Sequence, residues 1–383
     1  METSCSGKRP AVDEAAIIGA GPVGLALAIL LVQEGRAVRV FEQRTAPVEH
    51  SRAIGLHPPA QQILEQLGVG AKAQHAGVQI RGGLGISRGR SIAAMDFSVI
   101  GGAYRHVLSL PQQCTEQLLR ERLEDLAPGS VERGCAFERV LSQSQQTVEF
   151  AAGGVVHRAR WLAGADGVRS AVRTDLGVRF AGKNHHGCYL MGDFPDTTSL
   201  AHTAALFLHP HGIVESFPMP GRLRRWVVRF EKNPKDTSPE LLAETVGQRS
   251  GYLLNASSCT MSSLFGTATR LVPSMVHGRV LLLGDAAHQI SPIGGQGLSL
   301  GFQDAQAVAQ LVIGGGPLQA IDDLRLRAAR SAARRAQVNM LLGRALPGWA
   351  VPPRDAVFSR LAASAWLHQW VARDFTMTGL RRR

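Results

Sequence analysis

A glycine-rich corner between an apolar strand and an apolar helix constrains this chain more than any other feature. Residues 15–18 are predicted to form a buried strand, and Gly19-Ala20-Gly21-Pro22-Val23-Gly24 leads directly into a helix over residues 25–34. A second strand over residues 37–41 ends in Glu42. A GxGxxG turn between strand and helix, with an acidic residue about 20 positions further on, is the dinucleotide-binding fingerprint in its structural context. We therefore expect an α/β domain of the Rossmann type that binds an adenine dinucleotide.

Each glycine of this corner has its own task. Gly19 makes the tight turn, Gly21 lets a pyrophosphate approach the backbone, and Gly24 lets helix and sheet pack closely. Glu42 should accept hydrogen bonds from the ribose hydroxyls, which disfavours a phosphate at that position. The structural alternative is an ordinary strand-helix-strand unit with a glycine-rich corner. The residues expected to bind the cofactor at this end are Gly19, Ala20, Gly21, Pro22, Val23, Gly24, Glu42, Gln43 and Arg44.

The composition is that of a globular protein with a strong positive charge. The 383 residues are 45% hydrophobic and 19% charged, which allows two domains with a sizeable core. The net charge of +12 comes mostly from arginines scattered along the chain. No helix-turn-helix, zinc-ligand spacing or aromatic-basic platform accompanies them, so we expect no nucleic-acid partner. An anionic cofactor explains the charge better.

Cysteine usage and the apolar segments bear on the compartment. The five cysteines are far apart and include no CxxC pair, which favours reduced thiols in a cytoplasmic protein and disfavours a disulfide frame or a metal site. Residues 1–14 are polar and carry acids, so no signal peptide is expected. Three glycines and a proline interrupt the apolar run over residues 15–32, so we expect no transmembrane segment.

Two further motifs place an aspartate where an apolar strand ends. Asp285 follows the apolar run Leu281-Leu282-Leu283, and a glycine-dense loop over residues 291–299 then leads into a helix. Asp166 lies in an Asp-Gly turn, and a helix is expected to start near Ser170. Backbone N–H groups at a helix start attract anions and electron-rich carbonyls. Because two motifs place an aspartate in this way, a purely structural role is not expected for both.

Two other segments carry polar residues near these motifs. Arg52 lies in a loop that follows the second strand, and Gln112 and Gln113 lie at the entrance of a helix. All three could reach a cofactor. The alternatives are a solvated loop arginine and ordinary polar residues at a helix entrance.

The three motifs together resemble those of FAD-dependent aromatic hydroxylases, the single-component flavoprotein monooxygenases of the para-hydroxybenzoate hydroxylase type. GxGxxG at residues 19–24, the Asp-Gly motif at residues 164–173 and the Gly-Asp motif at residues 284–296 occur in the family's order. Residues 51–56 and 110–113 are most similar to the phenol and polyketide hydroxylase branch. The resemblance covers about residues 15–345.

The resemblance implies a role for each motif. Glu42 would hold the adenosine ribose, Arg52 with Gln112 or Gln113 would approach the FAD, and Asp285 would bind the ribityl or pyrophosphate region. Asp166 and Arg169 belong to a motif associated with both FAD and the nicotinamide donor. The loop that would cradle the isoalloxazine, with its preceding glycine, contributes Gly284, Pro292, Gly295, Gln296, Gly297, Leu298 and Ser299.

The implied fold has two interleaved domains of an α/β protein. Between residues 183 and 270 the apolar positions alternate with period two, as in antiparallel strands. The expected division gives residues 14–77, 108–182 and 266–383 to a Rossmann-like FAD-binding domain of the glutathione-reductase type, and residues 78–107 and 183–265 to a substrate-binding sheet. No C-terminal thioredoxin-like domain is expected, since few residues follow the Gly-Asp motif.

The implied activity is that of an FAD-dependent monooxygenase of secondary metabolism. NADH or NADPH would reduce the flavin, O2 would form the C4a-hydroperoxide, and an aromatic or polyketide-like molecule would be hydroxylated or epoxidised. The alternatives are a flavin-dependent halogenase, although no Trp-x-Trp-x-Ile-Pro segment occurs, a prenyl reductase, and a flavin-binding partner protein without turnover. A monomer or a homodimer is compatible with the sequence.

The catalytic residues stay unknown at this level. His209, His211, Arg222, Arg224 and Arg229 lie on or near the expected substrate sheet, where one of them could orient a substrate. His288 is interpreted as a structural hydrogen-bond partner rather than a base. Ser299 stands where many family members have asparagine, a small departure because that contact uses the main chain. Trp349, Trp366 and Trp370 are expected to pack between helices of the tail.

Overall fold

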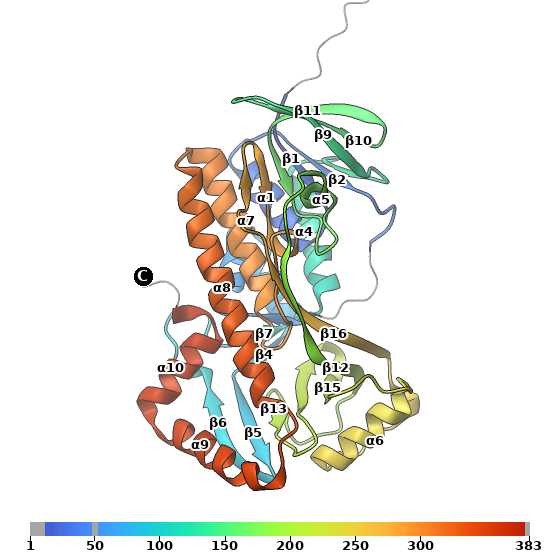
Figure 1. Ribbon diagram of the computed structural model, residues 1–383, viewed down its shortest axis with the longest axis vertical. Coiled ribbons are helices and arrows are strands. Elements are labelled where there is room, and N and C mark those ends of the chain that lie inside the picture. The colour runs from blue at the N-terminus through green and yellow to red at the C-terminus, as the bar shows by residue number, and fades with distance from the viewer. Residues whose placement is uncertain (1–11, 48–52, 380–383) are drawn as a thin grey trace, which may run out of the picture.

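The computed structural model describes residues 12–47 and 53–379 and divides into two lobes (Figure 1). One lobe surrounds a mainly parallel sheet, and the other is built on a larger sheet that is almost entirely antiparallel. A small three-stranded sheet lies at the junction of the lobes (Figure 1). It consists of β3 (Gly55–Leu56), β7 (Val107–Ser109) and β4 (Val78–Ile80).

The first sheet confirms the expected Rossmann-like domain. Its central strands run parallel in the order β18, β11, β1, β2, β8. Apolar strands pair in this way when both faces of the sheet are covered. The strands of this sheet are β1 (Asp13–Ile18), β2 (Val38–Glu42), β8 (Val131–Arg133), β9 (Phe137–Gln143), β10 (Val148–Ala152), β11 (Val155–Gly164), β17 (Val276–His277) and β18 (Val280–Leu282).

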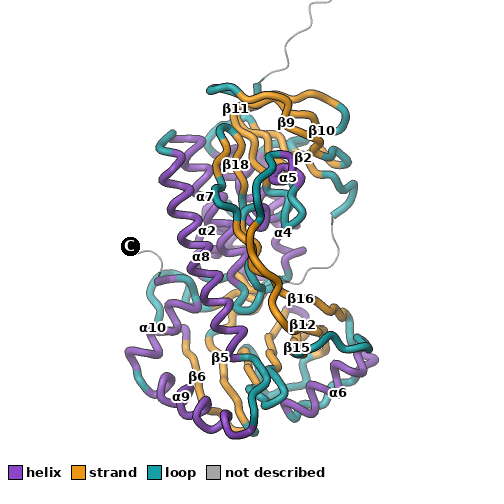
Figure 2. Tube along the Cα trace, viewed as in Figure 1, coloured by secondary structure: helices purple, strands orange, loops and turns teal. Residues whose placement is uncertain are grey.

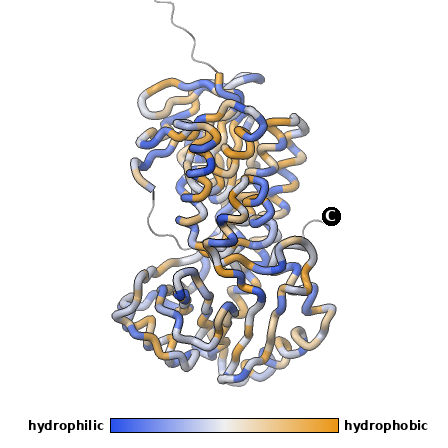
Figure 3. Tube along the Cα trace, turned by 180° about the vertical axis from the view of Figure 1, so that it is seen from behind, coloured by the Kyte–Doolittle hydropathy of each residue, from blue (hydrophilic) through white to orange (hydrophobic). Residues whose placement is uncertain are grey.

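Helix α1 (Pro22–Gln33) is apolar on every side because protein encloses it. Leu25, Leu27 and Ile29 are each at most 2% exposed, and the helix packs against α4 (Gln112–Leu126) and α7 (Gln296–Gly314). Figure 3 shows hydrophobic positions gathered along these central elements of the first lobe. In the described part of the chain, no helix combines the length and hydropathy that crossing a membrane would require.

The second sheet confirms the period-two pattern of the middle region. Its order is β19, β16, β12, β15, β14, β13, β5, β6, and only the pair of β13 and β5 is parallel. One face packs on α6 (Pro239–Ser250) through Trp226, Val228 and Leu242. The strands are β5 (Gly82–Ser87), β6 (Arg90–Asp96), β12 (Ala181–Pro195), β13 (Ala204–Phe207), β14 (Val214–Met219), β15 (Leu223–Phe230), β16 (Met261–Leu271) and β19 (His288–Gln289).

The lobes are joined by long elements. Strands β12 and β16 run from the second lobe up to the first. Helix α8 (Leu318–Leu342) extends alongside both lobes (Figure 2). The shorter helices are α2 (Pro58–Gln66), α3 (Gly70–Ala76) and α5 (Ala171–Asp175). The sequence predicts an Arg/Ala-rich helix over residues 324–342, and in the structure this helix starts six residues earlier, at Leu318.

The tail packs on the second lobe. Helices α9 (Val351–Ala363) and α10 (Ala365–Phe375) lie beside β5 and β6 (Figure 1), with Ser359 Oγ donating to the Ile92 carbonyl at 3.0 Å. The expected domain division stays a prediction, and this contact argues for placing the two helices with the second sheet. The expected packing of the tail tryptophans is wrong, because they are largely exposed: Trp349 79%, Trp366 70% and Trp370 58%.

Candidate functional site

Four parallel strands end at one edge of the first sheet and bring the three motifs together. Because β18, β11, β1 and β2 are neighbours, their carboxyl ends deliver Asp285, Asp166, Gly19 and Glu42 to the same edge. Backbone bonds join the strand ends there. Gly19 N donates to the Phe41 carbonyl at 2.8 Å, Ala165 N to the Ile18 carbonyl at 2.8 Å, and Leu283 N to the Gly164 carbonyl at 2.9 Å.

The GxGxxG corner is closed to side chains at two glycines and open at the third. A Cβ on Gly19, whose φ is +104°, would lie 2.6 Å from the Ala165 carbonyl oxygen, and one on Gly24 would lie 2.0 Å from the Gly19 oxygen. A Cβ on Gly21 would meet no described atom within 4 Å. Open space above a bare backbone is what an approaching pyrophosphate needs.

Glu42 is held on this corner by two backbone donors. Its Oε2 accepts from Ala20 N and its Oε1 from Arg44 N, both at 2.9 Å, and the residue is 8% exposed. A carboxylate oxygen can accept more than one hydrogen bond, so ribose hydroxyls can still bind. Ala20 is half-buried and Gln43 and Arg44 are exposed beside it.

The start of α4 lies close to this acid. Gln112 Nε2 donates to Glu116 Oε1 at 2.7 Å. Burial raises the pKa of Glu116, and the neighbouring Glu42 adds to the rise while Gln112, Arg120 and Arg44 oppose it. Gln113 is exposed. The predicted contacts of Gln112 and Gln113 with a cofactor stay predictions, and Arg52 lies outside the described residues.

Asp166 has one occupied and one unoccupied oxygen. Oδ2 accepts from Ala171 N at 2.7 Å and from Val172 N at 3.2 Å, which caps α5. Oδ1 is buried and has no hydrogen-bond partner among the described residues. A buried oxygen without a partner is unfavourable by about 1–3 kcal/mol, so a ligand donor at this position would stabilise the site. Arg169 is exposed nearby.

Asp285 presents an accessible carboxyl at the start of a short 3-10 turn, Gly284–Ala286. Neighbouring protein atoms reduce the hydration of the carboxylate and so raise the pKa of Asp285, and His288 opposes the rise. The residue is nevertheless exposed to solvent. The side chain is therefore available to a ligand.

A buried network behind Asp285 fixes the Gly-Asp corner, and of its members only His288 and Gly284 were singled out from the sequence. Asp304 on α7 accepts from His288 Nε2, from Arg325 Nε at 2.6 Å and from Gly284 N at 3.1 Å. Burial alone would raise the pKa of Asp304, but His288 and Arg325 together hold it below its usual value. His288 is thus a structural partner, as interpreted from the sequence. The one sequence signal for Asp304 is a carboxylate within an otherwise apolar helix face.

The glycine-dense loop is also fixed by a histidine. His57 Nε2 donates to the Gly294 carbonyl at 2.8 Å, and His57 N donates to Ser299 Oγ at 3.2 Å. Burial lowers the pKa of His57 to about 4, so the ring is neutral at physiological pH. Positive φ angles of 98° at Gly294 and 67° at Gly295 suit glycine.

The side chains at the start of α7 point away from the motif edge. Gln296 Nε2 donates to the Phe375 carbonyl at 3.1 Å, and its Oε1 accepts from Arg335 Nε at 3.1 Å. Leu298 packs against the core of the first lobe. A Cβ on Gly297 would meet no described atom within 4 Å, so the backbone at this position is open to a ligand. The first turn of α7 therefore offers its backbone N–H groups, rather than side chains, to a ligand. Pro292 is exposed in the loop.

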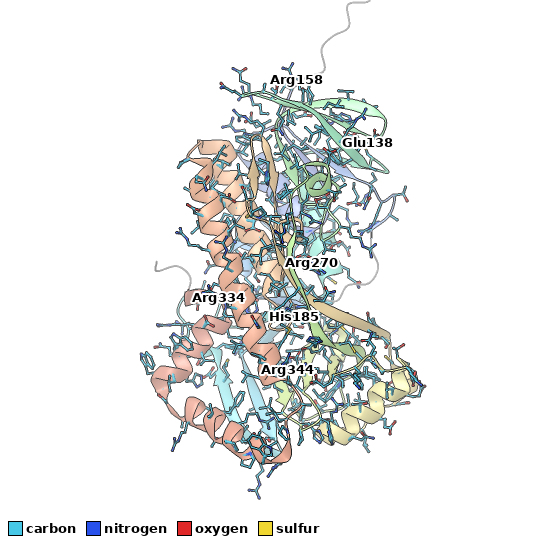
Figure 4. All side chains as sticks on the ribbon, in the orientation of Figure 1. Glu138, Arg158, His185, Arg270, Arg334 and Arg344 are labelled. Carbon is cyan, nitrogen blue, oxygen red and sulfur yellow. The ribbon has the colours of Figure 1, made fainter. Side chains whose placement is uncertain are left out.

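Two of the three arginines considered on or near the second sheet bind other residues of the protein. Arg224 forms a 2.9 Å ion pair with Asp196, and Arg229 Nη1 donates to the Met340 carbonyl at 2.9 Å. Arg222 is exposed. Figure 4 shows His185, Arg270 and Arg334 near the level at which the two lobes meet, and Arg344 lower, in the second lobe. None of the described residues form a cluster of three or more metal-binding side chains.

The comparisons with known proteins agree with this geometry. The family described as FAD binding domain matches residues 13–335. Rifampicin monooxygenase of Streptomyces venezuelae is 33% identical over 305 residues, which cover 76% of this chain and 61% of that protein. 6-Methylpretetramide 4-monooxygenase of Streptomyces rimosus is 32% identical over 310 residues, 76% of this chain and 54% of that protein. The chain thus spans less than two thirds of the length of these curated relatives.

A solved structure extends the likeness to the whole fold. The p-nitrophenol 4-monooxygenase of Pseudomonas putida DLL-E4 superimposes with a TM-score of 0.85 over 97% of this chain and 99% of that chain, at 23% identity. At this identity the likeness concerns the fold alone. It includes both lobes, because nearly all of each chain is covered.

Proposed function

The chain belongs to the FAD-dependent aromatic hydroxylase family, and from this premise we propose that it is an NAD(P)H-dependent monooxygenase. It would use O2 to hydroxylate or epoxidise an aromatic or polyketide-like small molecule. The observation that carries the proposal is the meeting of the three motifs at one sheet edge, with open backbone at Gly21 and an unpartnered oxygen on Asp166.

The residues at this edge fit the parts of FAD in order. Glu42 would accept from the adenosine ribose, the backbone at Gly21 would lie against the pyrophosphate, and Asp285 would bind the ribityl or pyrophosphate region. The first turn of α7 would direct N–H groups at the O2/N1 edge of the isoalloxazine, where negative charge develops on reduction. Bound FAD supplies the redox and oxygen chemistry, and the chain positions it and excludes water.

The nicotinamide donor would approach from the side of the Asp-Gly motif. Asp166 Oδ1 lacks a partner and Arg169 is exposed, so both can contact FAD or an anionic dinucleotide that arrives at this edge. The assignment of Asp166 and Arg169 to one of these two ligands is part of the proposal.

The proposal also includes the division of the chain into an FAD-binding first lobe and a substrate-binding second lobe, and a cytoplasmic location.

Purified protein tests the proposal directly. We expect bound yellow FAD, NAD(P)H oxidation and O2 uptake that aromatic compounds stimulate, and a product heavier by one oxygen atom. A protein that does not bind FAD would refute the whole assignment. Halide-dependent product formation would favour the halogenase alternative, and FAD binding without any NAD(P)H oxidation would favour a non-catalytic flavin-binding partner.

A further inference from the structure

A buried glutamate of the second sheet faces the first lobe. Glu215 lies on β14, near the centre of the sheet, and pairs across the sheet with Val227 and Leu206. Its neighbour Val214 belongs to the apolar cluster under α6, so Glu215 points to the opposite face. Val227 on that opposite face packs with Ile293 of the glycine-dense loop and with Met340 of α8.

Glu215 is buried without a partner. It is 8% exposed, and it makes no hydrogen bond or ion pair with any residue in the described part of the chain. Burial raises its pKa to about 7. A carboxyl in such surroundings is unfavourable unless a donor satisfies it. A donor supplied by a ligand removes that penalty.

The surroundings of Glu215 are apolar and aromatic. Tyr189, Met191, Val227 and Phe265 share its face with the partly buried Phe217. The field of Glu215 adds to the burial that raises the pKa of Tyr189. These side chains suit a flat, apolar ring, and Glu215 adds a hydrogen-bond acceptor on the same face.

The charged groups around this face bind residues other than Glu215, and of its arginines only Arg229 keeps a nitrogen without a partner in the described part of the chain. Arg225 forms a bidentate pair with Asp193, at 2.7 and 2.8 Å. Arg229 donates through Nη1 to the Met340 carbonyl and through Nη2 to Glu231, whereas its buried Nε has no hydrogen-bond partner among the described residues. On the covering elements, His57 is neutral and bound to Gly294, and His106 is bound to Gln74.

We propose that Glu215 binds the hydroxyl group of the substrate, which is therefore a neutral phenol rather than an aromatic acid. This rests on the monooxygenase function proposed above. The phenol O–H donates to the ionised carboxylate. When the ring is attacked, the O–H bond breaks, its electron pair stays on the phenol oxygen, and the proton bonds to a Glu215 oxygen. No redox change occurs in this proton transfer, and it increases the electron density of the ring.

The experiment compares matched probes on the FAD-loaded full chain. p-Cresol, phenol, p-toluate and benzoate are tested for stimulation of NADPH and NADH oxidation and for product formation between pH 5.5 and 8.5. Both phenols stay neutral over this range, so a transition near pH 7 belongs to the protein. We expect phenols to stimulate and benzoates not to, and kcat/KM for the phenol to rise with pH through about 7. Glu215→Gln should lower this kcat/KM by at least about tenfold and remove the pH dependence, at unchanged FAD content.

Matched variants separate this role from a structural one. Glu215→Asp keeps the carboxyl and should restore part of the pH dependence, while Glu244→Gln, an exposed acid of α6, should behave like the unmodified protein. Glu215→Leu should fold and retain FAD while losing phenol stimulation. An unfolded Glu215→Leu protein would instead assign Glu215 a structural role.

Other outcomes overturn the proposal in distinguishable ways. If Glu215→Gln keeps the phenol-stimulated rate and its pH profile, Glu215 is not the binding group although the monooxygenase function stands. Stronger stimulation by the benzoates than by the phenols would reject the phenol assignment. If none of the four probes stimulates the unmodified protein but another class of aromatic compound does, the function survives and the role of Glu215 as a phenol ligand is rejected. If no aromatic compound stimulates it, both proposals fail.

Discussion

Two glutamates with the same burial, one in each lobe, have opposite surroundings. Glu42 and Glu215 are each 8% exposed. Both oxygens of Glu42 accept a backbone N–H, whereas Glu215 has no partner among the described residues. The difference teaches that burial alone does not define the role of a carboxylate. A partnered one organises the backbone around it, and an unpartnered one is available to a ligand.

The strongest test of this contrast uses a third buried carboxylate that has three partners. Asp304→Ala would leave Arg325 and the Gly284 N–H without their acceptor in the core. We expect a loss of about 3–5 kcal/mol in the free energy of unfolding, because breaking a buried pair leaves an uncompensated charge. Urea denaturation of the protein without added FAD measures it. A loss below about 1 kcal/mol would show that the number of hydrogen-bond partners of a buried carboxylate does not predict its contribution to the free energy of unfolding.

The next largest effect is expected at Glu42. Glu42→Leu leaves the N–H groups of Ala20 and Arg44 without acceptors, which should lower the free energy of unfolding by about 2–4 kcal/mol. FAD should be lost on gel filtration as well. Denaturation with and without FAD separates the loss of stability from the loss of FAD binding. A variant that keeps both its stability and its FAD would contradict the role of Glu42 in organising the backbone around it.

Glu215 should show the opposite sign in stability. The pKa of Glu215 is about 7 in the folded protein, against 4.5 for an ordinary glutamate. Between these two pH values the folded state keeps a proton on Glu215 that the unfolded state releases. The contribution of this group to the stability of the protein therefore falls as pH rises from about 4.5 through 7. Glu215→Leu removes that loss. We expect its stability relative to the unmodified protein to be greater at pH 8 than at pH 4 by about 3 kcal/mol. An equal difference at both pH values would contradict the raised pKa.

The smallest effect on folding is expected at Asp285, whose carboxyl is exposed at the motif edge. Asp285→Ala should change the free energy of unfolding by less than about 0.5 kcal/mol, as surface substitutions do, yet weaken FAD retention. Flavin absorbance per protein after dialysis measures the second effect. Full FAD occupancy in this variant would refute the assigned role.

The motifs of the first lobe were predictable because each is local. A strand, a glycine turn and a helix start within a few residues specify where Gly19, Asp166 and Asp285 lie, and parallel pairing then brings them to one edge. Arg325 and Asp304 could not be paired in this way, since the contact depends on how α8 packs on α7.

The second lobe was less accessible to sequence reasoning. A glutamate in a strand with alternating polarity looks like a solvent-facing residue, and only the cover provided by Ile293 and Met340 shows that both faces of β14 are enclosed. The prediction for the tail tryptophans was wrong in the opposite sense, because they were expected to be buried and are exposed. Their size and helical setting favoured burial, but the structure leaves them exposed because α9 and α10 use other side chains to contact the sheet.

The strand order of the first sheet also sets when the cofactor edge can exist during synthesis. β1 is synthesised well before β11, which ends at Gly164, and before β18, which pairs with β11 and ends at Leu282. At about 5–20 residues per second, roughly a quarter of a minute to one minute passes before Asp285 can join Gly19. Until then the β18 side of β11, including Leu162, has no strand beside it. The nascent chain must therefore keep an apolar sheet edge from aggregating before it can hold a flavin.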